Sequence, residues 1–302
     1  MIGQYINGNY IVSLYEDGTK IRYTNDDEFY PEFAESIDCC ITKKCNENCP
    51  FCYESCTPRG KHAKLMLNET TPAQQWIYSL HKYTEIALNG NDLDHPELEQ
   101  FLKYLKHQQI VANITVNQNQ FVKNYNKLLD WYNEDLFKGL GVSICKVNDD
   151  VIYKIKKIPT TVIHTVIGIL DENQINILKN KKLSILLLGY KNIGRGEKFK
   201  ENNNDKILIN IKYLKENIKS LLSHFKIISF DNLALQQLNI QQNFENNINW
   251  DEFYAGDDGQ FTFYIDAVSK TYSKNSCEPP DKRFYINDLK VDEMFNIIRG
   301  KN

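Results

Sequence analysis

The chain has 302 residues, of which 42% are hydrophobic and 12% aromatic, and this is enough to bury a sizeable core without disulfide bonds. Its 36 basic and 39 acidic side chains give a formal net charge of -3, which excludes a whole-molecule field that would attract nucleic acid or anionic lipid. The N-terminus lacks the basic and apolar segments of a secretion signal, and no apolar run reaches the ~18 residues that a membrane span needs. We therefore expect a cytoplasmic protein with no membrane partner, in a compartment where clustered cysteines are more often metal ligands than disulfides.

Short β-rich runs and helix-like stretches alternate along most of the chain. Residues 8–24 contain two β-rich runs around Asp17-Gly18, a dipeptide that suits a tight hairpin turn. Strands are then predicted at residues 36–42, 84–90, 110–117, 139–146, 160–170 and 182–190. Helices are predicted between them at residues 71–83, 95–108, 121–133 and 171–180. This alternation is typical of repeated βαβ units and a parallel sheet.

The last third of the chain is predicted to add smaller elements. Residues 198–225 begin as an Asn- and Lys-rich loop, lead into an amphipathic helix, and are followed by a strand at 226–230. Residues 254–274 predict a second hairpin, and a short helix at 291–300 closes the chain.

We predict an α/β protein with three parts. Residues 36–235 form a partial parallel (β/α)6-type barrel, residues 1–35 form an N-terminal β-hairpin extension, and residues 236–302 form a small C-terminal α+β cap with a β-hairpin. In such a barrel, ligands collect at the carboxyl ends of the strands.

A cysteine-rich loop directly follows the first predicted strand of the barrel. Cys45, Cys49 and Cys52 have a C-x3-C-x2-C spacing, and soft thiolate ligands of this kind suit an iron-sulfur cluster. Three ligands leave one iron of a four-iron cluster open, as in catalytic rather than structural metal sites. Cys56 extends the spacing by C-x3-C, but a fourth ligand would close that open position, so we expect Cys56 not to bind the cluster.

This loop, with Phe51 before its third cysteine, resembles the signature of the radical S-adenosylmethionine (radical SAM) superfamily, and the resemblance covers roughly residues 36–235. It implies that Cys45, Cys49 and Cys52 hold a [4Fe-4S] cluster whose unique iron chelates SAM. It implies that one electron splits SAM to a 5'-deoxyadenosyl radical, which abstracts hydrogen from a substrate. It also implies a flavodoxin- or ferredoxin-type electron donor, and Phe51 becomes a candidate cofactor contact.

The stretch after the second predicted strand corresponds only in part to the Gly-Gly-Glu-Pro motif with which the family binds the SAM amine. Asn89, Gly90, Asn91 and Asp92 occupy that place, and only Gly90 matches. The carbonyl oxygen of Asn91 could accept a hydrogen bond from the amine, and Asp92 could supply the missing charge.

Other cofactor contacts implied by the resemblance lie at the ends of later strands. Asn117 is a candidate near the ribose, and Ser143 for the SAM carboxylate or the ribose hydroxyls. Gly189 and Tyr190 could flank adenine, and Arg195 could pair with a carboxylate of SAM or of the substrate. The alternative for each is a capping or turn residue.

The remaining cysteines and histidines carry weaker predictions. Cys39 and Cys40 are expected to pack as small hydrophobic residues in the first barrel strand. Cys145 and Cys277 are candidates for a catalytic hydrogen-atom donor, by analogy with the radical epimerases of this superfamily. The six histidines show no pair at metal-ligand spacing, which argues against a zinc hydrolase. His164 lies within a predicted inner strand, where it could point into the barrel, although a core position with its hydrogen bonds satisfied is more common.

The substrate does not follow from these residues, so three functions stay open. The first is radical SAM modification of a peptide or protein, for which the hairpins could receive an extended strand. The second is modification of a nucleotide, nucleoside or nucleic acid, with Lys191, Arg195 and Lys198 meeting phosphate. A third and more distant alternative is a nonenzymatic metal-binding protein with a cysteine loop.

Overall fold

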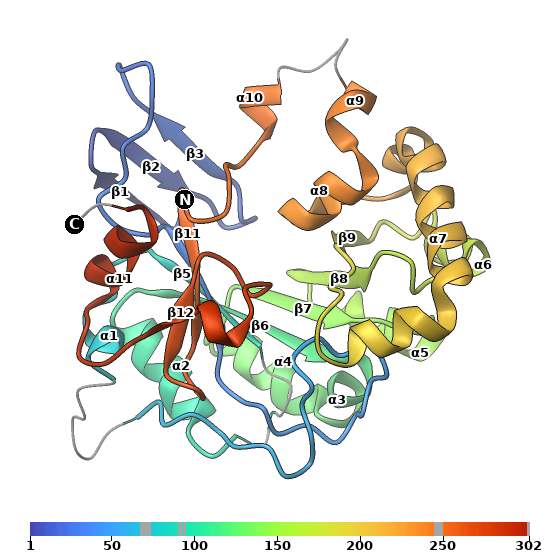
Figure 1. Ribbon diagram of the computed structural model, residues 1–302, viewed down its shortest axis with the longest axis horizontal. Helices are drawn as coiled ribbons and strands as arrows, with labels where there is room; N and C mark the ends of the chain where they lie inside the picture. Colours follow the sequence, from blue (N-terminus) through green and yellow to red (C-terminus); the bar gives the residue numbers. More distant parts are fainter. Residues whose placement is uncertain (67–73, 90–92, 94, 245–249, 301–302) are drawn as a thin grey trace.

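A ten-stranded, mostly parallel sheet forms the centre of the molecule (Figure 1). We describe it from a computed structural model, for residues 1–66, 74–89, 93, 95–244 and 250–300. The strand order is β10-β9-β8-β7-β6-β5-β4-β11-β12-β13, and all neighbours from β10 to β11 pair in parallel. The strands are β4 (Ser36–Cys40), β5 (Glu85–Asn89), β6 (Val111–Asn117), β7 (Gly139–Ser143), β8 (Thr161–Val166), β9 (Ser184–Leu188), β10 (Ile227–Phe230), β11 (Thr262–Asp266), β12 (Thr271–Ser273) and β13 (Phe284–Tyr285).

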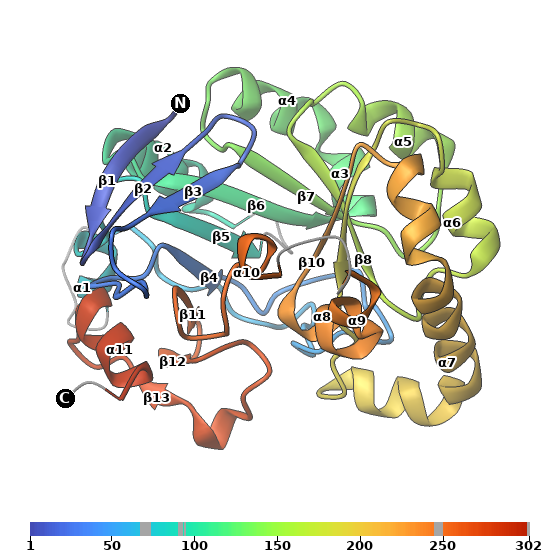
Figure 2. The ribbon, with the colours of Figure 1, turned by 90° about the horizontal axis from the view of Figure 1, so that it is seen from above.

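Helices connect the parallel strands and lie mainly along the outer side of the sheet (Figures 1 and 2). They are α1 (Gln75–Tyr78), α2 (Leu98–His107), α3 (Gln118–Lys123), α4 (Tyr125–Asn133), α5 (Asp149–Ile155), α6 (Glu172–Leu178), α7 (Arg195–Leu221), α8 (Asn232–Leu238), α9 (Ile240–Phe244), α10 (Trp250–Phe253) and α11 (Val291–Ile298). Single turns of 3-10 helix lie at Leu222–His224 and Pro280–Lys282. Among the described residues, no helix has the length and apolar character needed to cross a membrane.

The predicted alternation is confirmed, because the six predicted barrel strands correspond to β4 through β9. Within the part of the chain that the structure describes, the sheet does not close on itself through backbone hydrogen bonds, and its strand order ends at β10 and β13. Side chains nevertheless join its two ends: the Asn232 Nδ2 donates to Asp258 Oδ1 at 2.7 Å, and the Lys191 Nζ donates to Ser276 Oγ at 2.6 Å. The sheet therefore curves far enough for polar groups to meet across its open side.

Both terminal segments contain the predicted hairpins, and each has a further strand pairing that was not predicted. The hairpin of β2 (Tyr10–Leu14) and β3 (Lys20–Tyr23) turns at Gly18, whose φ is +86°, and β1 (Gly3–Asn7) adds a third antiparallel strand that the sequence pattern did not predict. The C-terminal hairpin of β11 and β12 is also present, but β11 pairs in parallel with β4. The segment predicted as a small cap therefore extends the central sheet.

The prediction of a loop at the start of 198–225 is wrong, because α7 is already helical from Arg195. The Asn202 Nδ2 donates to the Lys198 carbonyl at 2.8 Å and the Asn203 Nδ2 to the Phe199 carbonyl at 2.9 Å, one turn earlier in each case. Asparagine normally disfavours a helix, and these side-chain hydrogen bonds allow Asn202 and Asn203 to lie within α7. The helix is nevertheless kinked at Asn203, where the backbone angles are not helical.

The two faces of the parallel sheet have different environments. On the helix side the core residues are buried, whereas alternate positions on the opposite face are partly exposed along β4, β5, β6, β8 and β9. A parallel sheet is usually buried on both faces. We call this partly exposed side the inner face, and it is the side available to a ligand.

Candidate functional site

The cysteine loop, residues 45–57, leaves the carboxyl end of β4 and returns beside its own start. The backbone N–H of Cys45 donates to the Thr57 carbonyl at 2.9 Å, and Lys44 and Thr57 form an isolated bridge. The loop is therefore closed at its base and lies at the end of the parallel strands where α/β proteins bind ligands.

Arg195, the first residue of α7, holds the loop from one side. Its Nε donates to the Cys49 carbonyl at 2.9 Å, its Nη1 to the Cys56 carbonyl at 2.8 Å, and its backbone N–H to the Cys52 carbonyl at 3.1 Å. The preceding Gly194 has a φ of +58°, and a Cβ there would lie 2.3 Å from the Tyr53 carbonyl oxygen, so glycine permits this close approach. Arg195 was predicted to pair with a carboxylate. Two of its side-chain donors instead bind carbonyl groups of the cysteine loop.

The strand β6 and helix α3 hold the loop from a second side. The Asn117 Nδ2 donates to the Cys49 sulfur at 3.6 Å, while the Oδ1 of the same side chain caps α3 by accepting from the Asn119 N–H at 2.8 Å. Asn119 and Gln120 both donate to the Glu47 carboxylate, at 2.7 and 3.2 Å. The structure therefore brings the predicted residue Asn117 directly to a predicted cluster ligand.

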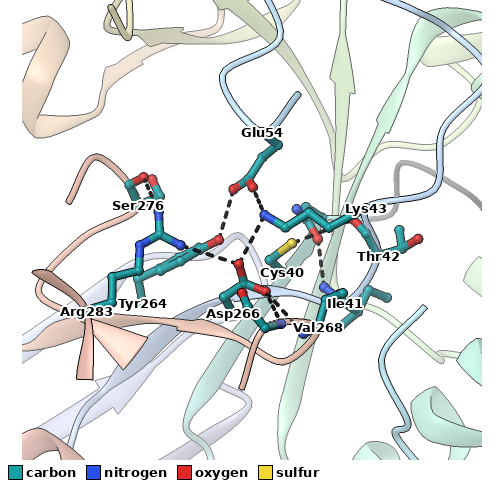
Figure 3. A network of polar contacts seen from close by, with 12 residues as sticks. Cys40, Ile41, Thr42, Lys43, Glu54, Tyr264, Asp266, Val268, Ser276 and Arg283 are labelled. Carbon is teal, nitrogen blue, oxygen red and sulfur yellow. Dashed lines mark hydrogen bonds and ion pairs between the residues drawn. The ribbon is translucent and has the colours of Figure 1, made fainter. Parts of the chain in front are cut away.

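A buried ion-pair network anchors the loop from a third side (Figure 3). Glu54, between Cys52 and Cys56, accepts a hydrogen bond from the Tyr264 hydroxyl at 2.9 Å and pairs with the Lys43 ammonium, which also lies 3.1 Å from Asp266. The sulfur of Cys40 and oxygens of Glu54 and Asp266 lie within 4.8 Å of one another and could hold a metal ion. Because Lys43 already pairs with both carboxylates, we interpret this group as an ion-pair network that fixes the loop to β11.

The three predicted ligands differ from the fourth cysteine in burial and bonding. Cys45, Cys49 and Cys52 are partly exposed, whereas Cys56 is only 2% exposed. A hydrogen bond from the Cys56 thiol lowers the pKa of Cys52 to about 6, assisted by the charge of Arg195 and opposed by burial. The lowered pKa favours the thiolate form of Cys52, which is the form that binds metals.

Cys49 lies in a crowded group of thiols. Burial raises the pKa of Cys49 to about 11, and repulsion from the thiolates of Cys145, Cys52 and Cys45 contributes to the shift. The sulfur atoms of Cys45, Cys49, Cys52 and Cys145 are therefore close enough for their charges to affect one another.

Two other predicted cofactor residues lie at strand ends near this loop. The Asn89 Oδ1 accepts from the Ile41 N–H at 2.9 Å and so ties the end of β5 to the residue after β4. Ser143 ends β7, is partly exposed, and lies between Asn117 and His164 in the sheet register. The predicted contacts Gly90, Asn91 and Asp92 lie outside the described residues.

The predicted adenine contacts are engaged within the protein. The Gly189 N–H donates to Asp231 at 2.8 Å, and a Cβ at Gly189 would lie 2.3 Å from the Leu233 side chain. The buried Tyr190 hydroxyl donates to the Gly196 carbonyl at 2.6 Å. Phe51 is partly buried and packs edge-to-face against Phe199 of α7, with ring centroids 5.7 Å apart.

The two candidate hydrogen-atom donors lie in different places. Cys145 follows β7, close enough to Cys49 to affect its pKa, and its N–H donates to Gln118 Oε1 at 3.0 Å. Cys277 follows β12, where burial raises its pKa and Lys191 partly offsets that rise. Cys39 and Cys40 are both buried, at 2% and 0% exposure, in agreement with the predicted packing role.

Two inner-face residues were not selected as site candidates from the sequence. His164 makes no hydrogen bond among the described residues, and burial lowers its pKa to about 4. The imidazole ring of His164 lies over Gly141 of β7, which has no side chain. A Cβ at Gly141 would lie 2.4 Å from that ring. Asp38 of β4 is exposed on the same face. Only the strand alternation could have indicated these positions, since neither belongs to a motif.

Comparison with protein-family models finds no match to the chain, and a search of curated protein sequences finds none either. The functional assignment therefore depends on the geometry of the loop and its surroundings.

Replacing Arg195 with alanine is expected to loosen the cysteine loop while leaving the fold intact. The substitution removes two charge-assisted hydrogen bonds, each worth about 1.5–3 kcal/mol, and both act on the loop rather than on the sheet. Hydrogen–deuterium exchange should become faster in residues 45–57, with little change in β5 to β8. Lys198→Ala, which removes an exposed cation from the same helix, is the matched control. Equal exchange in the two variants would show that Arg195 does not hold the loop.

Proposed function

We propose that this protein is a radical SAM enzyme that binds a [4Fe-4S] cluster through Cys45, Cys49 and Cys52. The observation that carries the proposal is the loop itself: three partly exposed thiols at the carboxyl ends of parallel strands, with Cys56 buried and bonded to Cys52. This donor set fits an iron-sulfur cluster with one open iron, because sulfur ligands suit iron and the fourth cysteine is buried and hydrogen-bonded to Cys52. We further propose that the curved sheet is the partial (β/α)6-type barrel of that superfamily.

When bound, the cluster would bind SAM and supply the electron that splits it to a 5'-deoxyadenosyl radical. The chain's own residues would fix the loop that holds it: Arg195 through the loop carbonyls, and Asn117 through the Cys49 sulfur. The Asn117 amide, as a donor to sulfur, would also tune the electronic properties of the bound iron. A flavodoxin- or ferredoxin-type protein in a cytoplasmic setting would supply the electron.

We favour a peptide or protein over a nucleotide as the substrate. A nucleotide would need free cations for its phosphates, but Lys191 donates to Ser276 and its Nζ lies 3.8 Å from the centre of the Tyr53 ring. Arg195 is bonded to the loop carbonyls. Of the three cations considered for phosphate binding, only Lys198 is exposed.

Anaerobic reconstitution with iron and sulfide tests the proposed function. We expect a brown protein with about four iron atoms per chain, and 5'-deoxyadenosine after dithionite and SAM are added. The control omits dithionite and should give no 5'-deoxyadenosine. A colourless, zinc-loaded chain would support the nonenzymatic alternative and contradict the proposal.

A further inference from the structure

A group of charged side chains crosses the open side of the curved sheet, next to the cysteine loop. Asp38 lies on β4, Lys191 follows β9, Asp231 follows β10 and Asp258 precedes β11. Their charges influence one another: Lys191 lowers and the other two aspartates raise the pKa of Asp38, which burial raises most. Three carboxylates and one ammonium group therefore lie near enough to one another, at the open side of the sheet, for the others to affect Asp38.

Two of the three carboxylates already have hydrogen-bond donors. Asp231 accepts from the backbone N–H groups of Gly189 at 2.8 Å and Ala234 at 2.7 Å. Asp258 accepts from Asn232 at 2.7 Å and Asn275 at 2.8 Å. These bonds fix both negative charges in place.

Lys191 is likewise directed away from Asp38. Its ammonium donates to the Ser276 hydroxyl and lies over the Tyr53 ring. Although its charge reaches Asp38, the two side chains form no ion pair within 4.0 Å in the described structure.

Asp38 is the carboxylate that stays open. Within the described residues it makes no hydrogen bond and no ion pair, and its side chain is exposed although it lies deep enough for burial to raise its pKa. Asp38 is therefore accessible from the open side of the inner face, although other charged groups lie near it. A deep carboxylate without a partner is costly, and a cationic ligand would remove that cost.

We propose that Asp38 binds a positively charged nitrogen group of the substrate, either a basic side chain or the α-amino group of a peptide. A metal ion is a poorer occupant, because Asp38 alone supplies too few ligands, one oxygen of Asp231 accepts two backbone N–H groups, and both oxygens of Asp258 accept from asparagine amides. Tyr53 connects the two sites: it belongs to the cysteine loop and packs against Lys191. A cationic group held at Asp38 would therefore place the adjoining part of a peptide beside the loop.

This inference rests on the proposed peptide substrate, but its test measures binding without SAM or reductant. The full-length chain, before and after anaerobic reconstitution, is titrated calorimetrically with three tripeptide amides. They are acetyl-Gly-Lys-Gly, acetyl-Gly-norleucine-Gly, and uncapped Gly-norleucine-Gly, so that side-chain and α-amino cations are separated. Failure of SAM cleavage would leave the binding result unaffected, and the two proposals can fail separately.

The expected result is that a cationic peptide binds and the acetylated norleucine peptide binds at least about tenfold more weakly, with Asp38→Asn removing this difference. Tighter binding of the lysine peptide indicates a basic side chain, and tighter binding of the uncapped peptide indicates the α-amino group. Asp288→Asn, which changes an exposed aspartate, should keep the wild-type preference.

Three results would overturn the inference: no binding to the wild-type chain, equal binding of charged and neutral peptides, or an unchanged preference in Asp38→Asn. A thermal unfolding scan provides the structural check. Because Asp38 has no partner among the described residues, Asp38→Asn should not lower the melting temperature. A clear decrease would show that Asp38 stabilises the fold rather than a ligand.

Discussion

Cys49→Ala is expected to yield a folded chain that retains no four-iron cluster and produces no 5'-deoxyadenosine. Cys49 is the middle ligand of the proposed set, and its sulfur is the one that Asn117 contacts, at 3.6 Å. Two remaining thiolates cannot replace three, because each sulfur binds a different iron of the cluster. The fold should persist, since the loop stays anchored through Arg195 and Glu54. Iron content, visible absorption and 5'-deoxyadenosine are the measurements, with circular dichroism as the check on folding.

Cys56→Ala is the matched control, because it removes a thiol from the same loop but not a proposed ligand. It should keep about four iron atoms per chain, although the loss of the hydrogen bond to Cys52 will raise the pKa of Cys52 and shift cluster assembly to higher pH. If Cys56→Ala loses the cluster as completely as Cys49→Ala, the protein binds iron through four cysteines. The proposed open iron would then be wrong.

The main sheet was predictable from sequence because its signals are local. The strands β4 to β9 are short β-branched runs between amphipathic helices, and both the order and the parallel pairing follow from that alternation. The position of Asn117 at the end of β6 was predictable for the same reason, as strand ends meet at one edge of a parallel sheet.

What the sequence could not predict depends on contacts between distant residues. Arg195 was predicted to face a ligand, but its partners are the carbonyls of Cys49 and Cys56, about 140 positions earlier, and backbone carbonyls carry no sequence signal. The pairing of β11 with β4 joins segments more than 200 residues apart, and no local pattern specifies it. Asp38 became a site candidate only when its exposure on the inner face and its lack of a partner among the described residues were known.

The N-terminal sheet is joined to the rest of the protein by a buried carboxylate. The Glu35 side chain is 0% exposed; Arg22 donates to it at 2.7 and 3.0 Å, the Tyr10 hydroxyl donates at 2.7 Å, and Lys20 lies 3.4 Å away. Lys20 also pairs with Glu85 at 2.7 Å, at the start of β5. One carboxylate thus connects two strands of the N-terminal sheet to the central sheet.

Glu35→Ala is expected to destabilise the protein by about 3–5 kcal/mol, because removing one partner of a buried ion pair leaves the other charges without compensation. Typical domains unfold at a cost of only about 5–15 kcal/mol, so the variant should unfold at much lower urea concentrations. Glu99→Ala is the matched control. It removes a carboxylate from the exposed i,i+4 pair with Lys103, where about 0.3–0.5 kcal/mol is expected. A loss no larger than that of the control would show that the Glu35 network contributes little.

The pH dependence of this effect has a definite sign. Burial by itself would raise the pKa of Glu35, but the hydrogen bond from Arg22 and the charges of Lys20 and Arg22 hold the pKa below its ordinary value. The unfolded chain therefore binds the proton more readily than the folded one, so the contribution of Glu35 is present above the unfolded pKa of about 4.3 and is lost as the pH falls through the folded pKa. The stability difference between the wild-type chain and Glu35→Gln, measured by urea denaturation, should be constant from about pH 6 to 8 and should shrink below about pH 4. A difference that grows on acidification would mean that Glu35 is protonated in the folded protein, and the ion-pair account of this junction would have to be abandoned.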